Sequence, residues 1–196
     1  MTDHGTGGSS PPVALAIAGV DPGGGAGILA DVSTFAALGV HAAAVVTALT
    51  AQGGQGVSHV HITPLDTVVA QLEAVLSSLP LAAVKVGMLG DAPTTGAVAE
   101  RAAAARLPHL VVDPEMSATL GGRLIDDDGT AALRDLLVPQ AEVLTPNRYE
   151  AGVLLGRPLT SDADAEDAAA ALARLEQLGY VTCSTVGIYS RTLLSV

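Results

Sequence analysis

Apolar residues along the chain occur in short continuous runs that alternate with longer amphipathic segments. These runs do not alternate strictly between apolar and polar positions, and several end at glycine or proline. Continuous runs of this length are typical of strands that are buried on both faces of a parallel sheet. They predict strands at Val13–Gly19, Ala42–Leu49, Ala82–Leu89, Leu110–Asp113 and Glu142–Thr145.

The segments between and after these strands have helical periodicity. In the segment that Pro64 opens, Val68, Leu72, Val75 and Leu79 recur at helical spacing before Pro80. The predicted helices are Ala26–Leu38, Pro64–Leu79, Pro93–Arg106, Thr130–Leu137, Asn147–Leu155 and Asp162–Leu178.

This alternation of strands and helices predicts an α/β fold with a mostly parallel sheet and helices on both faces. Such sheets bind ligands beyond the carboxyl ends of their strands. The segments to search for a site are therefore Gly19–Gly27, Thr50–Gly56, Gly87–Asp91, Asp113–Gly122 and Thr145–Glu150.

Composition narrows the function classes. The chain has 196 residues, 49% hydrophobic but only 2% aromatic, so its core is built from small side chains. Its net charge of −11 argues against nucleic-acid binding. No apolar run approaches the about 18 residues of a membrane span. Because Lys85 is the one lysine, a phosphate ligand would be bound largely by backbone amides and metal ions.

The two chain ends differ from the body in composition. Residues Met1–Pro12 are rich in Gly, Ser and Pro without a basic region, which predicts a disordered tail rather than a signal peptide. The single cysteine, Cys183, can form no internal disulfide and lacks metal-type spacing, so we expect a reducing, cytoplasmic location.

The glycine-rich segment Gly19–Gly27 lies between a predicted strand and a helix start. Its glycines would let the backbone approach a ligand, and free amides at the helix start would attract anions; the alternative is a tight turn. A P-loop is excluded because no lysine follows the glycines. A dinucleotide fingerprint fits Gly25, Gly27 and Ala30, but no acid lies between Asp31 and Asp66 to hold a ribose.

Several motifs occur together at the predicted strand ends. They are AGVDPGGGAGILAD at Ala18–Asp31, TALTAQ at Thr47–Gln52, KVGML at Lys85–Leu89, VVDPEM at Val111–Met116 and TPNRYEA at Thr145–Ala151. In this order they resemble the hydroxymethylpyrimidine/phosphomethylpyrimidine kinases, which belong to the ribokinase-like superfamily. The resemblance spans about Val13 to Gly179 and implies a three-layer ribokinase-like domain over 13–179.

The resemblance implies a small-molecule kinase of thiamin synthesis. Such an enzyme uses ATP and Mg²⁺ to phosphorylate 4-amino-5-hydroxymethyl-2-methylpyrimidine and then its monophosphate, and a homodimer is compatible with the family. Substrate-binding residues would be Gly19, Asp31, Gln52 and Met88, with Asp31 and Gln52 bonded to the aminopyrimidine ring. The residues implied near the ATP phosphates and magnesium are Asp113, Thr145, Asn147 and Glu150, with Glu150 holding the metal through water.

Each of these residues also has a structural interpretation. Asp31 alone would be a solvated helix residue, and Met88 would be core filler. Asn147 and Glu150 could form a helix N-cap and capping box after Pro146. The histidines show no metal spacing and are assigned no role.

Two departures from the family pattern matter. In VVDPEM, Glu115 replaces the usual valine and adds a negative charge beside the expected pocket. The family also has a later glycine-rich anion hole for the transferred phosphate, which nothing here matches. Residues 180–196 read as a tail unlike the family, and no catalytic residue is assigned. We therefore expect the sheet to be incomplete at its C-terminal side, and this chain to be marginally stable and not a competent kinase.

Two other functions stay open at this point. Pyridoxal kinases of the same superfamily also accept a hydroxymethylated ring. A non-catalytic pyrimidine-binding or regulatory module would share the pocket without the chemistry.

Overall fold

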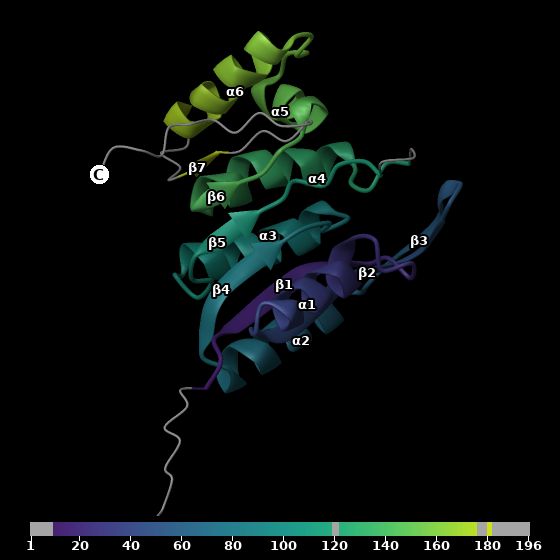
Figure 1. Cartoon of the computed structure of the whole chain (residues 1–196), viewed down its shortest axis with the longest axis vertical. Coiled ribbons are helices and arrows are strands. Elements are labelled where there is room, and N and C mark those ends of the chain that lie inside the picture. The colour runs from purple at the N-terminus through teal and green to yellow at the C-terminus, as the bar shows by residue number, and fades with distance from the viewer. Residues whose placement is uncertain (1–9, 119–121, 176–179, 182–196) are drawn as a thin grey trace, which may run out of the picture.

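A single twisted sheet runs through the computed structural model, which describes residues 10–118, 122–175 and 180–181. In the described part of the chain the sheet has seven strands in the order β3-β2-β1-β4-β5-β6-β7 (Figure 1). Every neighbouring pair is parallel except β2 and β3, which are antiparallel. The strands are β1 (Val13–Val20), β2 (His41–Gly53), β3 (Gly56–Ile62), β4 (Leu81–Val86), β5 (Leu110–Val112), β6 (Val143–Leu144) and β7 (Tyr180–Val181).

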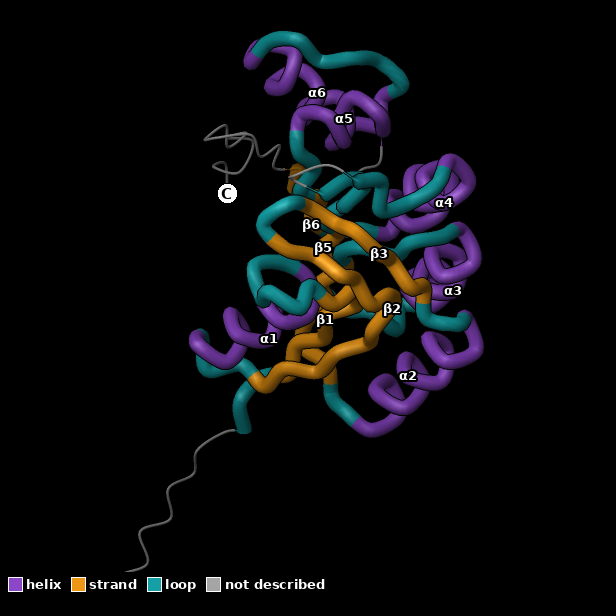
Figure 2. The backbone as a smooth tube through the Cα atoms, turned by 90° about the vertical axis from the view of Figure 1, so that its right-hand side faces the viewer, coloured by secondary structure: helices purple, strands orange, loops and turns teal. Residues whose placement is uncertain are grey.

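Helices cover both faces of this sheet, as predicted. Figure 2 shows α1 on one side of the strands and α2, α3 and α4 on the other. No helix in the described residues is long and apolar enough to cross a membrane. The helices are α1 (Gly27–Ala37), α2 (Leu65–Ser78), α3 (Ala92–Ala103), α4 (Asp127–Ala132), α5 (Arg148–Leu155) and α6 (Asp162–Leu175), and α4 continues as a π-helical turn at Leu133–Leu137 and a 3-10 turn at Val138–Gln140.

The two faces of β1 are packed differently. Leu15 and Ile17 are fully buried in the main core. Ala16 and Ala18 point to the opposite side, where they pack with Ile28 of α1. Small side chains on that side let α1 lie close to the strand, which brings the loop between β1 and α1 against the end of the sheet.

The predicted strands are present, with shifted ends. β4 stops at Val86 rather than Leu89 because Gly87 continues toward the site as an irregular segment. The hairpin strand β3 was not predicted, since its sequence GVSHVHI mixes apolar residues with exposed histidines. It extends the sheet beyond β2 and forms the edge next to Gln52.

The chain ends bear on the predicted domain limits. Residues 10–12 are exposed and irregular, and the rest of the predicted tail lies outside the described residues. Tyr180–Val181 pair with β6 as a parallel strand. The remaining tail residues, including Cys183, lie outside the described residues, so the limits at 12 and 179 stay predictions.

Candidate active site

The glycine-rich loop after β1 is organised by Asp21. One carboxylate oxygen accepts the N–H of Gly23 at 2.8 Å, and the other accepts those of Gly25 and Ala26 at 3.0 and 3.1 Å. The N–H of Gly24 donates to the Asp21 carbonyl. Asp21 therefore occupies three of the loop amides, whereas no side chain caps the start of α1. That amides at this helix start bind an anion stays a prediction.

Gly27 is the residue of this loop at which both the backbone angle and the available space oppose a side chain. Its φ is +57°, and a Cβ at this position would lie 2.3 Å from the Gly19 carbonyl oxygen. Val20 and Gly27 form a bridge across the loop. The loop thus serves to hold the start of α1 tightly against the end of β1.

A small polar cavity lies at the carboxyl ends of β2, β5 and β6. It has a volume of about 180 Å³. It brings together Gln52, from the predicted substrate side, with the four residues predicted on the nucleotide side, although these belong to segments far apart in sequence. Its described lining consists of Gln52, Asp113, Glu115, Ser117, Ala118, Leu124, Thr145, Asn147 and Glu150.

The ends of β5 and β6 position the first two nucleotide-side residues. Backbone bonds from Asp113 to Val86 and from Thr145 to Val112 carry the sheet pattern past the last assigned strand residues. Both side chains therefore lie just beyond the carboxyl ends of their strands. The Thr145 hydroxyl donates a hydrogen bond to Asp113 Oδ1 at 3.2 Å. This bond fixes the Asp113 carboxylate beside the cavity.

Lys85 links the substrate side to the nucleotide side. Its ammonium lies 3.2 Å from Asp31 Oδ2 and 3.7 Å from Asp113 Oδ2. Asp31 comes from α1, so this ion pair joins a helix to two strand ends. Asp31 itself does not line the cavity in the described residues.

Asn147 and Glu150 form the capping box that their spacing allows. Asn147 Oδ1 accepts the Glu150 N–H at 3.0 Å, and Glu150 Oε2 accepts the Asn147 N–H at 2.7 Å. Glu150 Oε1 is 3.4 Å from the Met116 N–H. The two side chains thus start α5 and also line the cavity.

Burial of the carboxyl groups that line the cavity disfavours their charged form relative to the protonated one. Burial raises the pKa of Glu150 from 4.5 to about 7, although the N–H groups of Asn147 and Met116 oppose this shift. Burial also raises the pKa of Asp113 and Glu115, against the lowering effect of Lys85. Raised carboxyl pKa values in a cleft are typical of functional sites.

Gly19 and Met88 lie together beneath this region rather than in the cavity wall. A Cβ on Gly19 would lie 3.0 Å from the Met88 sulfur. Met88 is 3% exposed and packs with Ala48 and Leu124, whose side chain lines the cavity. Both residues therefore support the site from below in this structure.

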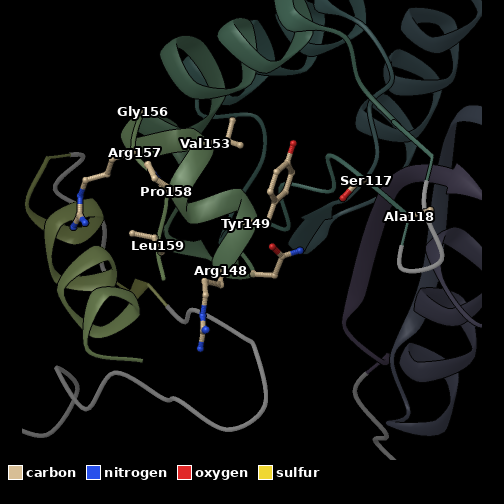
Figure 3. Close-up of a pocket in the computed structure, with 11 residues that line it drawn as sticks. Ser117, Ala118, Arg148, Tyr149, Val153, Gly156, Arg157, Pro158 and Leu159 are labelled. Carbon is tan, nitrogen blue, oxygen red and sulfur yellow. The ribbon is translucent and has the colours of Figure 1, made fainter. Parts of the chain in front are cut away.

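A second, larger pocket of about 790 Å³ opens beside α5 (Figure 3). It shares Ser117, Ala118 and Asn147 with the small cavity. In Figure 3 the Tyr149 ring stands between Val153 and Ser117. The Tyr149 side chain is largely exposed, so the pocket has an apolar wall open to solvent.

Three polar residues of this region received no role from the sequence. Asp21 and Lys85 stood within quoted motifs, and Glu115 stood out as a replacement for valine. A charged residue inside an apolar strand, as at Lys85, is the signal that could have drawn attention to it. Its partner Asp31, 54 positions away along the chain, was not predictable from spacing.

No group of three or more His, Cys, Asp or Glu side chains in the described residues is arranged to hold a metal ion directly. The oxygen donors of Asp113, Thr145, Asn147 and Glu150 nevertheless suit a hydrated Mg²⁺. Because Glu150 Oε2 already accepts an N–H, the metal contact predicted for this residue fits a water-mediated one.

Comparison with known proteins identifies the family of this chain. The family model described as phosphomethylpyrimidine kinase matches residues 21–184. A hydroxymethylpyrimidine/phosphomethylpyrimidine kinase of Synechococcus elongatus is 48% identical over 158 residues, which cover 81% of this chain and 60% of the relative. The chain thus spans about three fifths of the length of that relative.

Solved structures have the same fold. A phosphomethylpyrimidine kinase from Clostridium difficile has a TM-score of 0.79 and 33% identity, over 91% of this chain and 78% of that one. A pyridoxal kinase from Staphylococcus aureus in complex with pyridoxal has a TM-score of 0.81 and 32% identity, over 91% of this chain and 66% of that one. The fold is therefore the ribokinase-like fold expected from the motifs.

The family match covers most of the chain, and the cavity lies where the motifs end on the sheet. This chain belongs to the phosphomethylpyrimidine kinase family.

Proposed function

We propose that the protein is an ATP-dependent kinase acting in thiamin synthesis in the cytoplasm. It transfers the γ-phosphate of ATP to the hydroxymethyl group of 4-amino-5-hydroxymethyl-2-methylpyrimidine and then phosphorylates the resulting monophosphate. The observation that carries this proposal is the single cavity shared by Gln52 and the group Asp113, Thr145, Asn147 and Glu150. An acceptor and a phosphate donor must meet within one such site.

On the acceptor side, Asp31 and Gln52 would hold the pyrimidine ring. The Asp31 contact with Lys85 uses Oδ2, and Oδ1 would accept from the ring amine. Gln52 reaches the cavity from β2 and can both donate and accept. Gly19 and Met88 would form the base of this pocket.

On the donor side, Asp113, Thr145, Asn147 and Glu150 would lie near the ATP phosphates. Mg²⁺ would supply charge neutralisation of these phosphates. Glu150 would hold the ion through water, because its carboxylate also caps α5. The carboxylates thereby bind and orient the nucleotide, and none of them is assigned as the group that activates the hydroxyl.

Binding of the acceptor tests this proposal directly on the 196-residue chain. We expect isothermal titration calorimetry to show tighter binding of hydroxymethylpyrimidine than of pyridoxal. Tighter binding of pyridoxal would favour the second candidate, a pyridoxal kinase. The structural match to the Staphylococcus aureus enzyme supports this candidate.

Transfer of phosphate separates an enzyme from a binding module. We expect the whole protein, given ATP and Mg²⁺, to convert hydroxymethylpyrimidine to its mono- and diphosphate, which mass spectrometry would detect. Pyrimidine binding without any transfer would favour the non-catalytic module.

A further inference from the structure

The Glu115 side chain turns back from the end of β5 over the neighbouring strand ends. A Cβ on Gly87, which follows β4, would lie 3.7 Å from Glu115 Oε2 and 3.0 Å from Lys85 Nζ. The same Cβ would lie 3.2 Å from Ala18, at the end of β1. The carboxylate thus lies close to the ends of β4 and β1, and it also lines the cavity with Asn147 and Glu150.

This direction places Glu115 on the acceptor side of the cavity. The Met88 backbone N–H, immediately after Gly87, lowers the pKa of Glu115, although burial raises it more. A Cβ on Gly19 would lie 3.0 Å from the sulfur of the same Met88. Glu115 therefore shares its immediate surroundings with residues of the proposed pyrimidine site, and it lines the cavity with Gln52.

The charge around this position is unbalanced. Lys85 is surrounded by Asp31, Asp113 and Glu115, so one ammonium faces three carboxylates. The described lining of the cavity includes three carboxylates and neither lysine nor arginine. Lys85 is already engaged by Asp31 at 3.2 Å, which leaves it poorly placed to bind an added phosphate.

The VVDPEM motif resembles a family pattern that has valine at the position of Glu115. Valine carries no charge and does not distinguish an alcohol from its phosphate ester. A monophosphate carries about −1.5 to −2 charges at neutral pH. A carboxylate beside the acceptor repels that ester while leaving the uncharged alcohol little affected.

We propose that Glu115 is a specificity-determining residue that makes this site prefer the hydroxymethyl substrate over its phosphorylated form. This inference rests on the proposed function, since it concerns the two acceptors of the same reaction. It predicts a kinase biased toward the first phosphorylation, with the second step weakened by charge repulsion in the acceptor pocket.

The test compares two ligands in two variants. Hydroxymethylpyrimidine and its monophosphate are titrated by calorimetry into the wild-type chain and into Glu115→Gln, in magnesium buffer without nucleotide. Because one nearby unit charge changes affinity by about tenfold or more, we expect Glu115→Gln to raise the monophosphate affinity by at least about tenfold relative to that of the alcohol. Glu100→Gln, which neutralises an exposed carboxylate on α3, is the matched control and should leave the ratio unchanged.

A second variant guards against a folding defect. Glu115→Val restores the residue usual in the family and should change the ratio in the same direction as Glu115→Gln. Circular dichroism checks that both variants keep the wild-type helix content.

The outcomes separate this inference from the proposed function. An unchanged ratio in both folded variants, with wild-type binding of the alcohol intact, overturns the role of Glu115 and leaves the kinase proposal standing. A change in affinity for a non-hydrolysable ATP analogue, without a change in the acceptor ratio, also overturns it, because Glu115 would then act on the donor. Failure of the wild-type chain to bind the alcohol contradicts the proposed function itself.

Discussion

Two loops at the same edge of the sheet satisfy their polar groups in opposite ways. In the loop after β1, Asp21 binds the amides of Gly23, Gly25 and Ala26, and a buried carboxylate is matched by three donors. At the ends of β5 and β6, Asp113, Glu115 and Glu150 are carboxyl groups whose pKa burial raises.

The difference indicates which of the two regions a bound ligand would stabilise. In the first loop Asp21 binds three of the amides without a ligand, and the glycines shape the backbone. The second region contains charges that burial disfavours, and a ligand amine or a hydrated cation would relieve them. We call the glycine-rich loop after β1 the rigid half of this site. We call the region of Asp113, Glu115 and Glu150 the receptive half.

The largest expected effect is on the rigid half. Gly27→Ala would force a side chain into a backbone with φ of +57° and against the Gly19 carbonyl. Left-handed strain and overpacking together should lower the free energy of unfolding by about 3–5 kcal/mol. Urea denaturation measures this decrease in the free energy of unfolding. Gly24→Ala is the control, since its φ is +70° but nothing lies within 4 Å, and it should cost only about 1 kcal/mol.

A loss of similar size in both glycine variants would contradict this account of Gly27. It would mean that backbone strain alone, and not the close approach of α1 to β1, determines the cost.

The next largest effect concerns the pH dependence of stability. The pKa of Glu150 is raised from 4.5 to about 7, so the folded protein holds this proton more tightly than the unfolded chain. The stability that Glu150 contributes is therefore fully present below pH 4.5 and is lost as the pH rises through about 7. The loss should amount to about 2–3 kcal/mol.

Glu150→Gln isolates this contribution, because glutamine can complete a capping box without titrating. Its free energy of unfolding should fall less than that of the wild type between pH 4.5 and 8, in urea denaturation at a series of pH values. The exposed Asp164, whose pKa is lowered to about 2 from 3.8, acts below this window. Parallel pH profiles in the two proteins would contradict the raised pKa.

A smaller effect is expected at Asp21. Asp21→Asn leaves one carbonyl oxygen where two carboxylate oxygens accepted three N–H groups. Leaving donors unpaired in a largely buried position should lower the free energy of unfolding by about 1–3 kcal/mol. Thermal denaturation measures this loss. Pyrimidine affinity should change little, and a large loss of affinity with unchanged stability would instead place Asp21 in the ligand site.

The smallest expected effect is on pyrimidine binding by Asp31 of α1 and Gln52 of β2. Asp31→Asn and Gln52→Ala should each weaken hydroxymethylpyrimidine binding by about 1 kcal/mol or somewhat more, because each removes one partner of a polar contact. Calorimetry on folded variants measures the change. The control is Gln55→Ala, an exposed glutamine in the turn after β2. Unchanged affinity in both test variants would remove these residues from the pocket.

Much of the fold was predictable because local patterns decide it. Apolar runs such as VALAIAG become central strands, and the periodic segment before Pro80 becomes α2. The hairpin strand β3 escaped prediction because only one of its faces packs against the core, and its exposed His59 and His61 interrupt the apolar pattern. The glycines at 53, 54 and 56 were the available hairpin signal.

The candidate site was predictable only in part. Motif resemblance indicated which strand ends carry it, and the parallel sheet explains why those ends meet. The contact of Lys85 with Asp31 and the direction of the Glu115 side chain depend on how α1 and the β5 loop pack. Such long-range pairings leave no periodic signal in the sequence.

The contrast between the two loops is tested most directly by nuclear magnetic resonance of the isotope-labelled chain titrated with hydroxymethylpyrimidine. The account predicts the largest backbone amide shifts at Gln52, Glu115 and Thr145, around the cavity, and small shifts at Gly23, Gly25 and Ala26, whose N–H groups stay bound to Asp21. The largest shifts in the glycine-rich loop, with the ends of β5 and β6 unaffected, would contradict it.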